Sequence, residues 1–147
     1  MIAALLLEAA APQTPQAFVT HLYAHYRDEH FSPFDHIDAV FAPRLAAAIR
    51  LDRKLAGDEI GALDSDPICL CQDTDGLRGE IRRVVLIAPD KAVVSLTLHY
   101  AATPPTAPAR LTLQRLGSGW RVADVAMENG LSLLDWLTVQ NRRAAQH

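Results

Sequence analysis

The chain contains neither a cluster of basic residues nor a long run of apolar ones. Lysine and arginine together number 14, against 17 aspartates and glutamates, so the net charge is −3. Surfaces that bind nucleic acid are basic, and no nucleic-acid partner is therefore predicted. No apolar run approaches the ~20 residues that cross a bilayer as a helix, so no membrane span is predicted either.

The signatures of common enzyme classes are missing as well. The sequence has no P-loop, no dinucleotide-binding fingerprint, no HExxH pattern and no Ser-His-Asp order. These are short motifs that mark nucleotide, zinc and nucleophile sites. No cofactor is therefore predicted, and function has to be argued from single residues and from the fold.

The composition that remains suits one folded domain. The 147 residues are 50% hydrophobic, which is enough for one core, and residues 14–143 are predicted to form it. Residues 1–13 contain the apolar run Ile2–Leu7, followed by small residues before Pro12 that resemble a signal-peptide cleavage site. They lack the positively charged segment with which a signal peptide begins. They are interpreted as a truncated signal peptide or a disordered N-terminus. The expected location is periplasmic or secreted, and otherwise cytoplasmic.

Start signals and apolar spacing predict three helices in the first half of the domain. Each begins with a proline in its first turn, and a threonine or serine precedes the first two prolines as an N-cap. The first helix carries an amphipathic stripe that includes Tyr23 and Tyr26. The predicted helices cover residues 14–29, 32–41 and 43–56.

The second half predicts an antiparallel sheet. Residues 58–76 lack regular apolar spacing and hold several aspartates, so a long irregular loop is predicted before it. Pro89-Asp90 separates two alternating segments that should form a hairpin, and three prolines assign residues 103–108 to a loop. The predicted strands cover residues 78–88, 91–101, 109–116 and 120–127.

A final helix is predicted over residues 131–142. Ser132, with a carboxylate three residues later, has the spacing of a capping box. In the strand before it, strict alternation assigns Trp120, Val122 and Asp124 to one face.

The predicted order places helices first, an antiparallel meander next and one more helix last. This segregation of helices from strands is typical of an α+β domain. We expect N-terminal helices, a curved antiparallel sheet of about four strands and a closing C-terminal helix. The helices cannot bury their apolar stripes on each other alone, so the sheet should hold the first helix in its concavity.

Three stretches carry a resemblance to known proteins: AFVTHLYAHY at residues 17–26, the acidic loop ending in CQDTDG, and GWRVADV followed by SLLDWL. Together they resemble the nuclear transport factor two-like, or cystatin-like, α+β cone superfamily, and most closely a bacterial envelope family labelled a domain of unknown function. The resemblance covers about residues 15–142 and implies the cone fold. Some such proteins are isomerases, cyclases or dehydratases and many are binding modules, but no complete catalytic set transfers to this chain.

Asp124 is the best single candidate for chemistry. Beside Trp120 on an apolar wall, its carboxyl would have a raised pKa and could act as a general base, with Tyr23 and Tyr26 lining the same cavity. The alternative is a structural carboxylate that accepts hydrogen bonds near the start of the closing helix, with the tyrosines as core residues. No catalytic residue is assigned.

Cys69 and Cys71 form a CxC pair and are the only cysteines. Two thiols at this spacing can bind a soft metal or cycle as a redox pair. A metal site needs further ligands, and a disulfide between these positions closes too short a loop to clamp the fold.

Two polar clusters are weaker candidates for metal binding. Residues 73–76 resemble part of a calcium loop, but counting from Cys71 the twelfth position is Arg82, which excludes an EF-hand. Ad hoc calcium binding and a solvated acidic loop stay open for Asp64, Asp66, Asp73 and Asp75. On the first helix the spacing i, i+4, i+8 can hold a divalent metal or form a solvated face; these residues are His21, His25 and Glu29.

Three functions are compatible with these observations. The preferred one is a non-enzymatic envelope domain that binds a small ligand or protein partner through its cone or its acidic loop. The second is a small isomerase- or hydrolyase-type enzyme with Asp124 as general base. The third is an inhibitor or immunity-type protein acting through residues 58–76. The partner is an unknown protein or small molecule, and a homodimer is left open.

Overall fold

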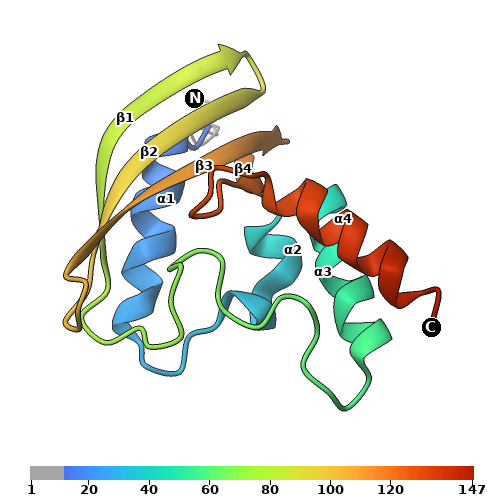
Figure 1. The fold of residues 1–147 in the computed structure, drawn as a ribbon. Helices are drawn as coiled ribbons and strands as arrows, with labels where there is room; N and C mark the ends of the chain where they lie inside the picture. Colours follow the sequence, from blue (N-terminus) through green and yellow to red (C-terminus); the bar gives the residue numbers. More distant parts are fainter. Residues whose placement is uncertain (1–11) are drawn as a thin grey trace, which may run out of the picture.

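The computed structural model describes residues 12–147, so most of the segment interpreted as a signal peptide lies outside the described residues. Helices come first, followed by four antiparallel strands in the order β1-β2-β3-β4 and a closing helix, which confirms the α+β prediction. Figure 1 shows a curved sheet with α1 on its concave side and α2, α3 and α4 gathered on the side of β4. Within residues 12–147 no helix is long and apolar enough to cross a membrane.

Helix α1 (Pro15–Ala24) begins as predicted, because the Thr14 hydroxyl accepts a hydrogen bond from the N–H of Ala17 at 3.0 Å. Its predicted end near Glu29 is wrong. The α-helix stops at Ala24 and tightens into a 3-10 turn, η1 (His25–Arg27), which is a frequent way for a helix to end. Its buried residues are Phe18, Val19, Leu22 and Tyr23. The helix itself lies against the concave side of the sheet (Figure 1).

The second predicted helix is divided in the structure. It consists of the 3-10 turn η2 (Pro33–His36) and one α-helical turn, α2 (Ile37–Val40), because the backbone at His36 leaves the helical region with φ −135°. Helix α3 (Pro43–Ala56) is confirmed, and Gly57 ends it in a conformation with φ +63° that favours glycine.

The four strands pair in sequence order. They are β1 (Arg78–Ala88), β2 (Lys91–His99), β3 (Thr106–Leu116) and β4 (Gly119–Val125). The prediction that residues 103–108 are all loop is wrong, since β3 begins at Thr106 and Pro108 lies opposite Thr97 of β2. The pairing of β3 with β4 begins only at Leu111. Proline is tolerated in this part of β3 because, among the described residues, no strand pairs with that edge of β3 there.

A β-bulge corrects the predicted faces of β4. Val122 pairs with Leu113 and Asp124 pairs with the adjacent Thr112, so Ala123 is an extra residue without a partner. One extra residue reverses the alternation that follows it. Val125, 2% exposed, therefore joins Trp120 and Val122 in the core, and Asp124 leaves the face on which strict alternation had placed it.

Helix α4 (Leu133–Ala144) closes the domain against α3. The predicted cap is confirmed, as the Ser132 hydroxyl accepts a hydrogen bond from the N–H of Asp135 at 3.1 Å. Leu133 and Leu137 are buried, and the amide of Asn141 donates to the Ala48 carbonyl of α3 at 2.9 Å.

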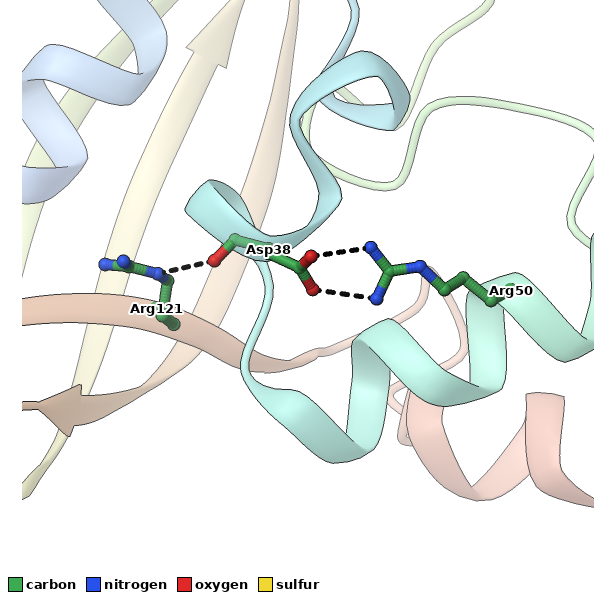
Figure 2. Close-up of polar contacts among 3 residues, drawn as sticks. All are labelled: Asp38, Arg50 and Arg121. Carbon is green, nitrogen blue, oxygen red and sulfur yellow. Dashed lines mark hydrogen bonds and ion pairs between the residues drawn. The ribbon is translucent and has the colours of Figure 1, made fainter.

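An ion pair ties α2 to α3 (Figure 2). The Asp38 carboxylate accepts two hydrogen bonds from the Arg50 guanidinium, at 2.7 and 2.8 Å, and Arg50 holds the pKa of Asp38 below its usual value. The Asp38 carbonyl accepts a further hydrogen bond from Nε of Arg121, on β4, at 2.8 Å. These contacts position the helices at the edge of the sheet. The charged groups are largely exposed, so the pair adds little stability by itself.

Candidate functional site

An open groove of about 990 Å³ lies between α1 and the border of the sheet. One wall is formed by α1 and the residues after it, and the opposite wall is residues 73–80, the end of the acidic loop and the start of β1. Within residues 12–147, β1 pairs only with β2, so its other edge leaves backbone N–H and C=O groups free. We call this feature the α1–β1 groove. Its helical wall consists of Thr20, Tyr23, Ala24, Tyr26, Arg27 and Glu29.

The base of the groove depends on a close contact between Tyr23 and Gly79. A Cβ atom on Gly79 would lie 2.7 Å from the tyrosine ring, closer than carbon atoms can approach. Glycine in a strand often marks such a close approach. A side chain at position 79 would therefore clash with Tyr23, and glycine lets α1 and β1 pack closely at the base of the groove.

Tyr23 and Tyr26 are each 5% exposed, and both hydroxyls are hydrogen-bonded. The hydroxyl of Tyr23 donates to the Ile68 carbonyl at 2.8 Å, and that of Tyr26 donates to the Asp66 carboxylate at 2.6 Å. Burial and the nearby Asp66 raise the pKa of both tyrosines, so neither is suited to lose its proton. They act as an aromatic floor with anchored hydroxyls.

Asp66 differs from the other three aspartates singled out in the long loop because its side chain is partly buried, whereas theirs are exposed. Burial raises its pKa, while hydrogen bonds from Tyr26 and from the backbone of Ile68 and Cys69 oppose that rise. The carboxylate thus fixes the backbone of the CxC segment. This role could not be inferred from sequence, where the four aspartates look equivalent.

Cys69 and Cys71 form a disulfide, with their Cα atoms 5.1 Å apart. The Tyr100 hydroxyl donates to the Cys69 carbonyl at 2.6 Å, which makes it the third tyrosine to hold the 66–71 segment. Tyr100 was not among the residues singled out by sequence. Its only signal was its alternation with the buried residues of β2.

Asp124 caps α4 instead of facing a cavity. Its carboxylate accepts hydrogen bonds from the Ser132 hydroxyl and from the N–H of Leu134, the latter at 2.9 Å. Neither the groove nor the two smaller clefts, of about 510 and 340 Å³, include it in their walls. Trp120 does not line them either, being 3% exposed, and its indole N–H donates to the Gln13 carbonyl at 2.8 Å.

The residues considered for metal binding are not brought together. No group of three histidine, cysteine or acidic side chains is arranged to hold a metal ion in residues 12–147. His21 and His25 are exposed, and the His25 ring stacks on Phe31 with centroids 5.1 Å apart. Asp73 accepts a hydrogen bond from the N–H of Asp75 within its own turn. Asp64, Asp73 and Asp75 are exposed.

Arg27 and Arg78 line the groove and were missed by sequence analysis. The only signal was their position beside other candidates, Arg27 after Tyr26 and Arg78 at the start of a strand. The two arginines are about fifty positions apart in the sequence, and only the packing of α1 against β1 brings them to the same groove.

Comparison with known proteins finds no match: neither a family model, nor a curated protein, nor a solved structure is similar to this chain. The resemblance to the cone superfamily therefore stays a prediction, and function has to be argued from the groove and its neighbours.

Proposed function

We propose that this protein is a non-enzymatic binding domain of the bacterial envelope, and that it holds an extended segment of a partner protein in the α1–β1 groove. The observation that carries the proposal is the position of the groove beside the free edge of β1. A strand edge with unpaired backbone groups can accept another extended chain, which gains main-chain hydrogen bonds there.

The charges around the groove favour a polypeptide over a ligand of a single charge sign. Arg27 and Arg78 line it together with four carboxylates, those of Glu29, Asp73, Asp75 and Glu80. A peptide can place side chains of either sign along such a groove, whereas a polyanion would meet the carboxylates. Beneath these charges, Tyr23 and Tyr26 form the packed base of the groove.

Two further points support the proposal. The Cys69–Cys71 disulfide suits an oxidising compartment such as the periplasm or the outside of the cell. Asp124, the base in the enzymatic alternative, is already engaged at the start of α4. The inhibitor-type alternative uses the same surface, because residues 73–76 of the acidic loop form part of the groove wall.

A matched pair of variants tests the proposal with peptides selected from a random display library. Ala24 is exposed and lines the groove, so Ala24→Trp should obstruct it without disturbing the core. Ala47 is exposed on α3, outside the groove, and Ala47→Trp is the control.

Peptides selected on the unmodified chain should bind Ala24→Trp at least about tenfold more weakly, which corresponds to about 1.4 kcal/mol. They should bind Ala47→Trp normally, and amide exchange should slow in β1 when they bind. Equal binding by both variants, or failure to select any peptide, would contradict the proposal.

A further inference from the structure

The segment around the disulfide keeps its backbone conformation through contacts that do not involve sulfur. The hydroxyls of Tyr23 and Tyr100 donate to the carbonyls of Ile68 and Cys69. On the other side, Asp66 accepts hydrogen bonds from the N–H groups of Ile68 and Cys69, at 2.8 and 3.4 Å. Breaking the S–S bond removes none of these contacts, so one backbone conformation suits both the disulfide and the dithiol.

The two sulfur atoms have different surroundings. Cys69 is fully buried, whereas Cys71 is partly exposed and lines the cleft of about 510 Å³ between α3 and residues 60–66. The same cleft includes Arg53, whose guanidinium lies 4.4 Å above the Phe34 ring. The cleft therefore offers an incoming thiolate a route to Cys71, whereas Cys69 is closed off. Arg53 shares this cleft with the carboxylates of Asp52, Asp64 and Asp66.

The environment of Cys69 also suits its reduced form. Two carbonyl oxygens, those of Cys71 and Asp66, lie 3.1 and 3.7 Å from its Sγ, although this sulfur carries no proton in the disulfide. After reduction the same oxygens can accept a hydrogen bond from the Cys69 thiol. Once the two sulfurs have moved apart to non-bonded distance, a buried Cys69 thiol would thus have a hydrogen-bond partner close by.

A structural role explains these features less well. A disulfide that closes a loop of three residues stabilises a fold only weakly in the chain-entropy model, because so short a loop constrains the unfolded chain little. The segment it closes is already fixed by the tyrosines and Asp66. Leu70, between the cysteines, has φ +52°, a conformation that non-glycine residues adopt at a cost and that is frequent at functional sites.

We propose that Cys69–Cys71 is a redox-active disulfide that oxidises a dithiol by exchange at Cys71. A thiolate of the dithiol attacks the Sγ of Cys71, a mixed disulfide forms, and the electron pair of the S–S bond leaves on Cys69. Cys69 takes up a proton. The second thiolate of the dithiol then attacks its partner sulfur in the mixed disulfide and releases Cys71, which is protonated in turn.

Two electrons and two protons pass from the dithiol to the protein, and the dithiol becomes a disulfide. This activity is independent of the α1–β1 groove, because Cys71 lies in a separate cleft. It would add to the binding role a stoichiometric reaction with protein dithiols, in which each chain delivers one disulfide and is itself reduced.

The first experiment compares the rate of reduction of the folded chain by dithiothreitol with its rate in concentrated urea, followed by alkylation and mass measurement. We expect the two rates to agree within about tenfold, since the folded protein already exposes the sulfur that is attacked. Reduction of the folded chain more than about tenfold slower than that of the unfolded chain would show that reduction requires unfolding and would overturn the proposal.

The second experiment identifies the reactive sulfur. Brief alkylation of the reduced, folded chain should modify Cys71 before Cys69 in a peptide map, and equal or reversed labelling would contradict the proposal. Cys69→Ala, which keeps Cys71, should react faster with an aromatic disulfide reagent than the matched variant Cys71→Ala, which keeps Cys69. The peptide map needs no variant, so the test survives if one of them fails to fold.

The third experiment measures the activity itself. The oxidised chain, mixed with a peptide that carries two cysteines, should produce up to one peptide disulfide per chain. The double variant Cys69→Ala/Cys71→Ala should produce none above the background of the peptide in air. A yield equal to that background with the unmodified chain would refute the exchange activity.

Discussion

Replacing Trp120 by alanine should be among the most destabilising single changes in this chain. The side chain is 3% exposed, belongs to the buried face of β4 together with Val122, and donates its indole N–H to the carbonyl of Gln13. A buried tryptophan hides about 150–250 Å² of surface. At ~25 cal/mol per Å² this is worth about 4–6 kcal/mol, and measured losses for aromatic-to-alanine changes are about 3–5 kcal/mol.

The assay is urea unfolding followed by circular dichroism. With a slope of about 2 kcal/mol per molar urea, a loss of about 4 kcal/mol moves the midpoint down by about 2 M. Trp120→Phe retains most of the buried apolar area but cannot donate to Gln13, so it should cost only about 1–2 kcal/mol.

Trp136→Ala is the internal control, because Trp136 is the other of the 2 tryptophans and is only partly buried. Its midpoint should fall clearly less than that of Trp120→Ala. A midpoint for Trp120→Ala that equals the unmodified chain, or lies above that of Trp136→Ala, would show that Trp120 does not support the core.

Three further predictions follow from the polar contacts. Asp124→Asn should lower stability by about 0.5–2 kcal/mol in urea unfolding, the usual worth of a helix cap, and leave peptide binding intact; unchanged stability would contradict the capping role. The chain-entropy model assigns the disulfide about 1.6 kcal/mol of stability, and each kcal/mol shifts the melting temperature of a chain of this size by about 2–4 °C. Reduction should therefore lower the melting temperature by no more than about 3–6 °C, and a fall of tens of degrees in a monomer would contradict this. Burial raises the pKa of Asp66 in the folded state above its ordinary 3.8, so the folded state binds this proton more tightly than the unfolded chain does. The Asp66 contribution to stability is therefore greatest at acid pH and is lost as the pH rises through the folded-state pKa. The decline in the free energy of unfolding from pH 3.8 upwards should be weaker in Asp66→Asn than in the unmodified chain. An identical pH profile for the two would refute the assignment.

The helix starts and the order of elements were determined by the sequence alone. Thr14 caps α1 and Ser132 caps α4 through backbone N–H groups only three residues away. Such contacts depend on residue type and spacing, so they can be recognised without knowing the fold. The same holds for the hairpin at Pro89-Asp90, where a turn pair lies between two alternating segments.

Tertiary packing decided where the candidate site residues point. One bulged residue, Ala123, turned Asp124 away from the face that strict alternation predicts. Pro108 lies in a strand because β4 does not reach that part of β3. Neither outcome has a local signal, because each depends on which strand lies alongside and where its pairing begins.

The clearest example is the contrast between Asp66 and the rest of the acidic loop. Its partner Tyr26 is 40 positions away, and Tyr100 reaches Cys69 across 31 positions. A local pattern identifies an acidic loop and a pair of cysteines. Only the closed fold brings the tyrosines to them, because burial and hydrogen bonding between distant segments are set by how the helices pack on the sheet and not by the residues next in sequence.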